Sequence, residues 1–170
     1  MTKKETYPKS FSHIGITVPN IKDAVKFYSE IMGWYIIMEP SIVKKEKETA
    51  IGQMCIDVFG EDWEEFEIAH MSTSDGIGIE LFSFPHGVKE APAFNPFNIG
   101  LFHFCIQDPE IETLIEKIVA AGGKQRMPIR EYYPNEKPYK MCYVEDPFGI
   151  VFEIYTHSYE LTYSSGAYAN

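Results

Sequence analysis

Alternating apolar and polar positions predict a strand over residues 11–18, followed by an amphipathic helix. Within the strand, Ile16 points to one face and His13 to the other. Asn20 is a favourable N-cap, and the apolar stripe after it stops at Gly33, a residue type that often ends helices. Because the helix can cover only the Ile16 face of the strand, we expect His13 to lie on the open face of a sheet.

The same pattern returns 90 positions later, where segment 103–111 repeats segment 13–21. Asp108 and Pro109 then provide an N-cap and a first helical residue, and the apolar stripe that follows runs to a Gly-Gly pair. A self-similar pair of this length indicates that one supersecondary unit is used twice. We therefore expect His103, like His13, on the open face of a sheet.

Further alternating segments complete each half as strand, helix, strand, strand, strand. The expected strands are 34–43, 66–71 and 77–84 in the first half, and 125–133, 139–145 and 150–156 in the second. A short helix at 49–59 has no counterpart in the second half. The predicted organisation is one domain, 1–170, with a first module at 11–85, a second at 100–157, and a tail at 158–170.

The last strand of each half carries a glutamate, Glu80 or Glu153, on the face that the helix leaves open. An unpaired buried carboxylate costs several kcal/mol or shifts its pKa until it is neutral, so these residues need a partner. Two imidazoles and two carboxylates suit one divalent ion such as Ni, Co, Zn, Mn or Fe(II), with one or two positions left for water or substrate. Taken singly, each residue is more often structural or exposed. Repeated in register, His13, Glu80, His103 and Glu153 predict a metal site.

This arrangement resembles the vicinal oxygen chelate superfamily, also called the glyoxalase, bleomycin-resistance and dioxygenase family. The resemblance covers residues 11–157. It implies an α+β fold in which two tandem βαβββ modules form an open, cup-shaped mixed sheet with the helices outside. Metal ligands then come from the first and last strands of each module, and His-Glu-His-Glu is the set used by glyoxalase I-like enzymes. The family-like contexts are Ile79-Glu80-Leu81, Asp146-Pro147-Phe148-Gly149 and Phe152-Glu153.

The resemblance implies a metal-dependent lyase or isomerase of the glyoxalase I type, similar to lactoylglutathione lyase. The metal would polarise two vicinal oxygens of a small substrate and stabilise an enediolate, while a metal-bound glutamate moves a proton between carbons. Glu153 is the first candidate for this base and Glu80 the second. The substrate stays open, because no stretch matches a glutathione-binding motif.

Two other functions remain in competition. One is an Fe(II) extradiol-type dioxygenase with His13, His103 and Glu153 as a facial triad. In that case Glu80 would occupy a position that oxygen chemistry needs open. The other is a metal-free binding protein of the bleomycin-resistance type, in which the cup sequesters a small molecule.

Four further residues are candidates for substrate contact. His70 lies on a predicted strand, and a packed structural histidine is the competing interpretation. Tyr155 and His157 follow on the Glu153 face of the last strand, where His157 is equally well explained as exposed. Arg130 could hold an anionic group or be ordinary surface charge.

Composition narrows the class of partner. The formal net charge of −10, with scattered Lys and Arg, argues against nucleic acid. Three cysteines without Cys-x-x-Cys spacing argue against a disulfide framework or a thiolate zinc site. The apolar runs fall far short of the roughly 20 residues that cross a bilayer, and the first residues lack the apolar core of a signal peptide. We expect a cytoplasmic homodimer that binds a small molecule, with neither nucleic acid nor membrane as a partner.

Overall fold

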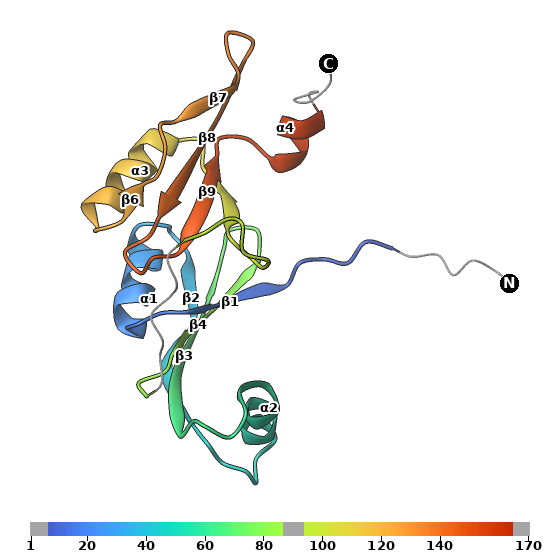
Figure 1. The fold of residues 1–170 in the computed structure, drawn as a ribbon, viewed down its shortest axis with the longest axis vertical. Coiled ribbons are helices and arrows are strands. Elements are labelled where there is room, and N and C mark those ends of the chain that lie inside the picture. The colour runs from blue at the N-terminus through green and yellow to red at the C-terminus, as the bar shows by residue number, and fades with distance from the viewer. Residues whose placement is uncertain (1–6, 87–93, 165–170) are drawn as a thin grey trace, which may run out of the picture. The chain divides into compact units, whose positions relative to one another are not determined.

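The computed structural model describes residues 7–86 and 94–164, and the chain divides into two compact units, Met1–Val88 and Lys89–Asn170. Each unit has one mixed sheet and its own helices (Figure 1). The predicted α+β class is therefore confirmed. The first unit contains β1 (His13–Thr17), α1 (Ile21–Glu30), β2 (Tyr35–Lys44), α2 (Ala50–Phe59), β3 (Glu65–Ser72) and β4 (Gly78–Ser83). The second contains β5 (Phe104–Gln107), α3 (Ile111–Ala120), β6 (Lys124–Gln125), β7 (Arg130–Tyr133), β8 (Lys137–Glu145), β9 (Val151–Tyr155) and α4 (Tyr159–Ser164).

The sheet of the first unit has the order β1-β4-β3-β2, with β1 parallel to β4 and the other pairs antiparallel. Helix α1 covers one face of this sheet, where it contacts β2, β3 and β4. The buried side chains between them include Ile16, Ile21, Ala24, Tyr28, Met71, Ile79 and Leu81. His13, which alternates with this apolar set, is left on the other face, as the strand pattern predicts.

Helix α1 begins as predicted. The Asn20 side-chain oxygen accepts hydrogen bonds from the backbone amides of Lys22, at 3.0 Å, and Asp23, at 3.2 Å. These amides have no partner within the helix, so the cap satisfies two otherwise unpaired donors. The predicted end is wrong by two residues: Ile31 is the C-cap, and Gly33 follows it in a left-handed conformation with φ of +69°.

Replacing Asn20 by alanine is expected to lower the free energy of unfolding by about 1 kcal/mol, because both amides lose their acceptor. Urea unfolding of wild-type protein, Asn20→Ala and Asn20→Asp measures this. Aspartate keeps the acceptor and should retain most of the stability. If both variants lost the same free energy of unfolding, the acceptor oxygen at position 20 would not be what stabilises the helix.

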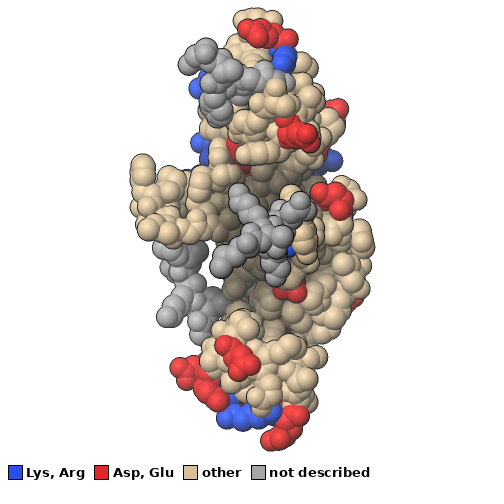
Figure 2. Space-filling view, turned by 90° about the vertical axis from the view of Figure 1, so that its right-hand side faces the viewer, with Lys and Arg blue, Asp and Glu red and all other residues tan. Residues whose placement is uncertain are grey.

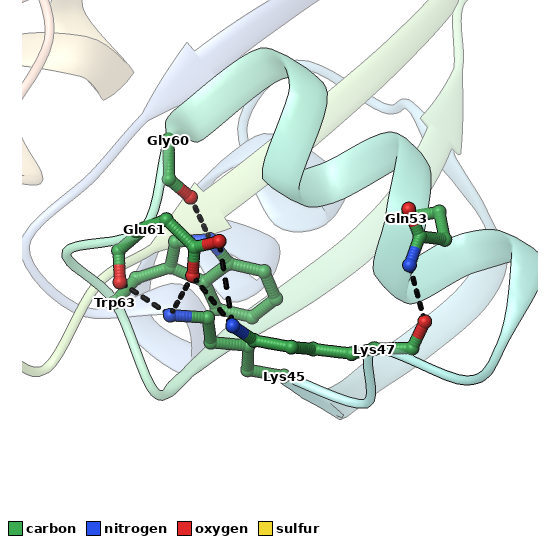
Figure 3. Close-up of polar contacts among 6 residues, drawn as sticks. All are labelled: Lys45, Lys47, Gln53, Gly60, Glu61 and Trp63. Carbon is green, nitrogen blue, oxygen red and sulfur yellow. Dashed lines mark hydrogen bonds and ion pairs between the residues drawn. The ribbon is translucent and has the colours of Figure 1, made fainter.

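The predicted helix at 49–59 is confirmed as α2. Thr49 caps it by accepting a 3.0 Å hydrogen bond from the amide of Gly52, and Gly60, with φ of +80°, ends it. Beyond Gly60 the chain is tied back to the turn that precedes the helix: Lys45 Nζ lies 2.9 Å from Glu61 Oε2, and Lys47 Nζ lies 3.2 Å from the same oxygen (Figure 3). The Lys45 hydrogen bond, aided by Lys47, lowers the pKa of the Glu61 carboxyl.

Helix α2 lies on the side of the sheet opposite α1 (Figure 1), and one aromatic residue attaches it there. The ring centroid of Phe59 is 5.5 Å from that of Phe66, 6.1 Å from that of Phe82 and 5.4 Å from that of Phe84. Phe82 is two residues beyond Glu80 on the same strand and so shares its face. The open face of the first sheet therefore carries the candidate ligands next to an aromatic cluster.

The sheet of the second unit has the order β5-β9-β8-β6, with β7 also paired to β8. Strand β5 is parallel to β9, as β1 is to β4. Helix α3 packs on β6 and β8. The buried side chains of this unit include Ile111, Leu114, Ile118, Val144, Phe152 and Ile154.

Three predictions for the second unit need correction. The strand expected at 125–133 is two short strands, β6 and β7, separated by a segment that contains Pro128, which has no amide to donate to a sheet. Asp108 is not the N-cap: its Oδ1 accepts a 2.8 Å hydrogen bond from the amide of Glu110 in a preceding turn, and α3 begins after Glu110. The first strand starts at Phe104, so His103 directly precedes it.

The predicted tail begins with a helix, α4, which the sequence did not indicate. Residues 165–170 of that tail lie outside the described residues. No helix in the described part of the chain is both long and apolar enough to span a membrane. On the face shown in Figure 2, acidic side chains form small separate groups with a few Lys and Arg among them.

Candidate metal centre

The first unit brings His13 and Glu80 together. Their strands, β1 and β4, are parallel neighbours, and the register places Gly78 opposite His13. A Cβ at Gly78 would lie 3.0 Å from the His13 Cβ, so a larger residue there would require the His13 side chain to shift. His13 Nε2 is 3.7 Å from Glu80 Oε2, and His13 Nδ1 is 3.2 Å from Ser12 Oγ. The Nε2 atom therefore faces the carboxylate and is free of the serine contact.

His70 lies on the other side of the same carboxylate. Strand β3 is antiparallel to β4, and His70 is directly opposite Glu80. His70 Nδ1 is 3.7 Å from Glu80 Oε1, so each carboxylate oxygen faces a different imidazole. The three side chains are partly exposed: 53% for His13, 29% for Glu80 and 33% for His70.

The second unit repeats the His–Glu pair. His103 directly precedes β5, Glu153 lies on β9, and His103 Nε2 is 3.6 Å from Glu153 Oε2. The atoms and the spacing match those of His13 and Glu80. The second pair is more deeply buried, with side-chain exposures of 23% for His103 and 7% for Glu153.

Burial raises the pKa of Glu153 to about 7, although hydrogen bonds from Tyr155, Tyr143 and Cys105 act in the opposite direction. This carboxyl group can therefore both accept and release a proton near neutral pH. Burial, and then the Glu153 charge, raise the pKa of the Cys105 thiol to about 12. In the metal-free protein Cys105 is therefore a protonated thiol at neutral pH.

The His103 ring is held among aromatic side chains. Its centroid is 4.2 Å from that of Phe102 and 5.1 Å from that of Tyr143, both edge-on. Burial lowers the pKa of His103 and so favours the neutral imidazole, the form that binds metals. Within the described residues, its buried Nδ1 has no hydrogen-bond partner.

The donor atoms of both pairs fit a divalent ion. Distances of 3.6 and 3.7 Å are too long for hydrogen bonds. Two ligands each about 2.1 Å from one ion lie roughly 3.0 to 3.5 Å apart, so a small closure of each pair would suffice. Within either unit, no three of the described His, Cys, Asp and Glu side chains are placed closely enough to hold a metal ion. Each unit thus supplies a pair of candidate ligands.

The remaining candidates for substrate contact have other surroundings. Tyr155 is buried, with 4% exposure, and its hydroxyl lies 2.8 Å from that of Tyr132. His157 Nδ1 is 2.8 Å from Thr156 Oγ1, and its ring packs on Tyr139 with centroids 4.2 Å apart. Arg130 is exposed on β7. Contact of these residues with a substrate stays a prediction.

Sequence reasoning missed a cluster of tyrosine hydroxyls beside Glu153. The hydroxyl oxygen of Tyr163, on α4, lies 3.0 Å from that of Tyr132 and 2.8 Å from that of Tyr155. The crowding of tyrosines near the C-terminus was the available signal, but it does not say which rings meet. Tyr143 was also missed, because its place opposite Glu153 depends on the register of β8 and β9, which alternation alone does not give.

Solved structures with similar folds include a glyoxalase family protein from Bacillus cereus, with 21% identity, a TM-score of 0.69, and coverage of 91% of this chain and 97% of that one. Glyoxalase I from Zea mays is 19% identical, with a TM-score of 0.59, and the match covers 87% of this chain and 44% of the maize chain. The fosfomycin resistance protein FosX from Listeria monocytogenes, complexed with Mn(II), is 16% identical, with a TM-score of 0.57 and coverage of 94% and 98%. These likenesses show the fold.

No curated protein matches the sequence. A family model, described as the Glyoxalase/Bleomycin resistance protein/Dioxygenase superfamily, matches residues 10–154. That span includes both His–Glu pairs and nearly all of both sheets. The chain belongs to the glyoxalase, bleomycin resistance protein and dioxygenase superfamily.

Proposed function

We propose that this chain is a metal-dependent lyase or isomerase of the glyoxalase I type, acting on a small substrate with vicinal oxygens. His13, Glu80, His103 and Glu153 would together hold one divalent ion, which is Ni, Co, Zn, Mn or Fe(II). The observation that carries the proposal is the repeated pair: Nε2 of a histidine faces Oε2 of a glutamate at 3.7 Å in one unit and 3.6 Å in the other. Neutral imidazole and carboxylate ligands suit these ions.

Structural neighbours support a metal-dependent reaction of this kind. One is glyoxalase I from maize, and another is FosX, which was solved with Mn(II). The match covers less than half of the maize chain, so the activity of the whole maize enzyme is not assigned to this protein. The predicted homodimer and cytoplasmic location stay predictions.

A bound divalent ion would supply Lewis-acid polarisation of the substrate oxygens. Glu153 is our first candidate for moving a proton between adjacent substrate carbons, because its side chain is the more buried of the two glutamates, with 7% exposure against 29% for Glu80. Glu80 is the second candidate. The step is an internal proton transfer, so it needs no oxidant or reductant.

The test is metal-dependent proton exchange at a substrate carbon. Metal-free protein is reloaded with each ion and incubated in D₂O with thiol adducts of 2-oxoaldehydes and with α-branched acyl thioesters, and deuterium incorporation is followed by NMR. We expect exchange that requires the ion and falls about 100-fold or more in Glu153→Gln. Glu116→Gln, an exposed change on α3, is the matched control and should keep wild-type exchange.

Two other results would each replace this proposal. Oxygen uptake with a catechol, dependent on Fe(II), would favour the dioxygenase. Tight binding of a small molecule that neither needs a metal nor leads to exchange would favour the binding protein.

A further inference from the structure

Each candidate glutamate has a side-chain partner directly across from it on the adjacent antiparallel strand. His70 on β3 is opposite Glu80 on β4, and Tyr143 on β8 is opposite Glu153 on β9. Directly opposite residues place their side chains on the same face of a sheet, within reach of each other. The internal repeat therefore extends beyond the four candidate ligands to one neighbour of each glutamate.

In the second unit this neighbour is a hydrogen-bond donor to the glutamate. The Tyr143 hydroxyl hydrogen-bonds with Glu153, an interaction that lowers the carboxyl pKa against the larger effect of burial. In the first unit the equivalent position holds an imidazole, whose Nδ1 is 3.7 Å from Glu80 Oε1. The other oxygen of Glu80, Oε2, faces His13. The two oxygens of this carboxylate are thus divided between a candidate metal ligand and His70.

We propose that His70 is a positioning residue for Glu80. Its Nδ1–H donates to Oε1, which leaves Oε2 as the oxygen presented to the metal and fixes the carboxylate as a one-oxygen ligand. This inference rests on the proposed metal site. Hydrogen bonding to the non-ligating atoms of metal ligands orients them, and loss of such a partner typically costs about 10- to 100-fold in metal affinity.

The geometry needs only a small change to form this hydrogen bond. A distance of 3.7 Å is about 0.5 to 1.0 Å longer than an N–H···O bond. His70 is one-third exposed, so its ring is not locked in the apolar core. His70 Nδ1 faces Oε1 of Glu80, whereas His13 Nε2 faces Oε2, so the two imidazoles lie at different oxygens of the carboxylate. The role of His70 is therefore to act through Glu80.

Two substitutions of equal size test whether the donor matters. Asparagine at position 70 can present an amide N–H close to the place of Nδ1, whereas leucine has the same shape without a donor. Co(II) is titrated into metal-free wild type, His70→Asn and His70→Leu, and both affinity and the visible absorption of bound Co(II) are recorded. His86→Ala, at an exposed histidine in the turn after β4, controls for loss of an imidazole. His70→Ala replaces the leucine variant if that variant does not fold.

We expect His70→Leu to bind Co(II) about 10- to 100-fold more weakly, with an altered absorption band because the carboxylate can then rotate or chelate through both oxygens. His70→Asn should bind Co(II) with an affinity within a few-fold of wild type and with a similar absorption band. His86→Ala should match wild type in both affinity and absorption. Wild-type affinity and spectrum in His70→Leu would overturn the role of His70 while leaving the metal site intact. Absence of Co(II) binding by the wild type would instead overturn the metal site and, with it, this inference.

Discussion

Glutamine in place of Glu153 is expected to make the metal-free protein more stable at pH 8, by about 3 kcal/mol. In the wild type, burial raises the carboxyl pKa to about 7, from its ordinary value of 4.5. At pH 8 the folded protein must therefore hold a buried negative charge, which the neutral amide removes. A pKa difference of this size corresponds to about 3 kcal/mol at pH values above both pKa values.

The same shift determines the sign of the pH dependence. Between pH 4.5 and 7 the folded state binds more protons at Glu153 than the unfolded state does, so stability falls as the pH rises through this window. Below pH 4.5 the Glu153 carboxyl is protonated in both the folded and the unfolded state. Above pH 7 the folded state bears the full free-energy cost of a buried carboxylate. Urea unfolding at pH 5 and pH 8 should show this loss in the metal-free wild type and in Glu116→Gln, and a much smaller one in Glu153→Gln. Equal losses in wild type and Glu153→Gln would contradict the burial of a titrating carboxyl here.

Alanine in place of His103 is expected to weaken divalent-metal binding more than 100-fold. Loss of an outer hydrogen-bond partner already costs about 10- to 100-fold, so loss of a ligand should cost more. Burial lowers the pKa of His103 and so favours its neutral form, and its Nε2 faces the carboxylate of Glu153. The imidazole is thus prepared to bind an ion without first losing a proton.

Alanine in place of His13 should have an effect of similar size, although this residue belongs to the first unit and is half exposed. His86→Ala is the matched control and should bind metal as the wild type does. The affinities come from calorimetric titration of Zn(II) or Ni(II) into metal-free protein. Strong weakening by His103→Ala with none by His13→Ala would mean that the second unit binds metal without the first.

Local patterns predicted most of the elements and the side-chain directions of the metal candidates. Strand alternation placed His13 and Glu80 on the face opposite Ile16 and Leu81, and that face is the open one. This succeeded because the period of a strand is two, so burial of one residue determines the direction of its neighbours.

Local sequence patterns could not predict contacts between segments that are distant in the sequence. The partner of Glu80 on β3 depends on the register of two strands, and alternation alone does not identify His70. Tyr163 meets Tyr132 and Tyr155 only because α4 folds back on the second sheet. The Asp108 side chain satisfies a turn instead of a helix because two local structures compete for the same oxygen.

We propose that two half-sites, one in each unit, hold a single ion. Calorimetric titration of metal-free wild-type protein with Zn(II) or Ni(II) tests it most directly, because it counts ions per chain. The predicted result is one tightly bound ion per chain. Two equivalent ions per chain, or no tight binding of any divalent ion, would contradict the account.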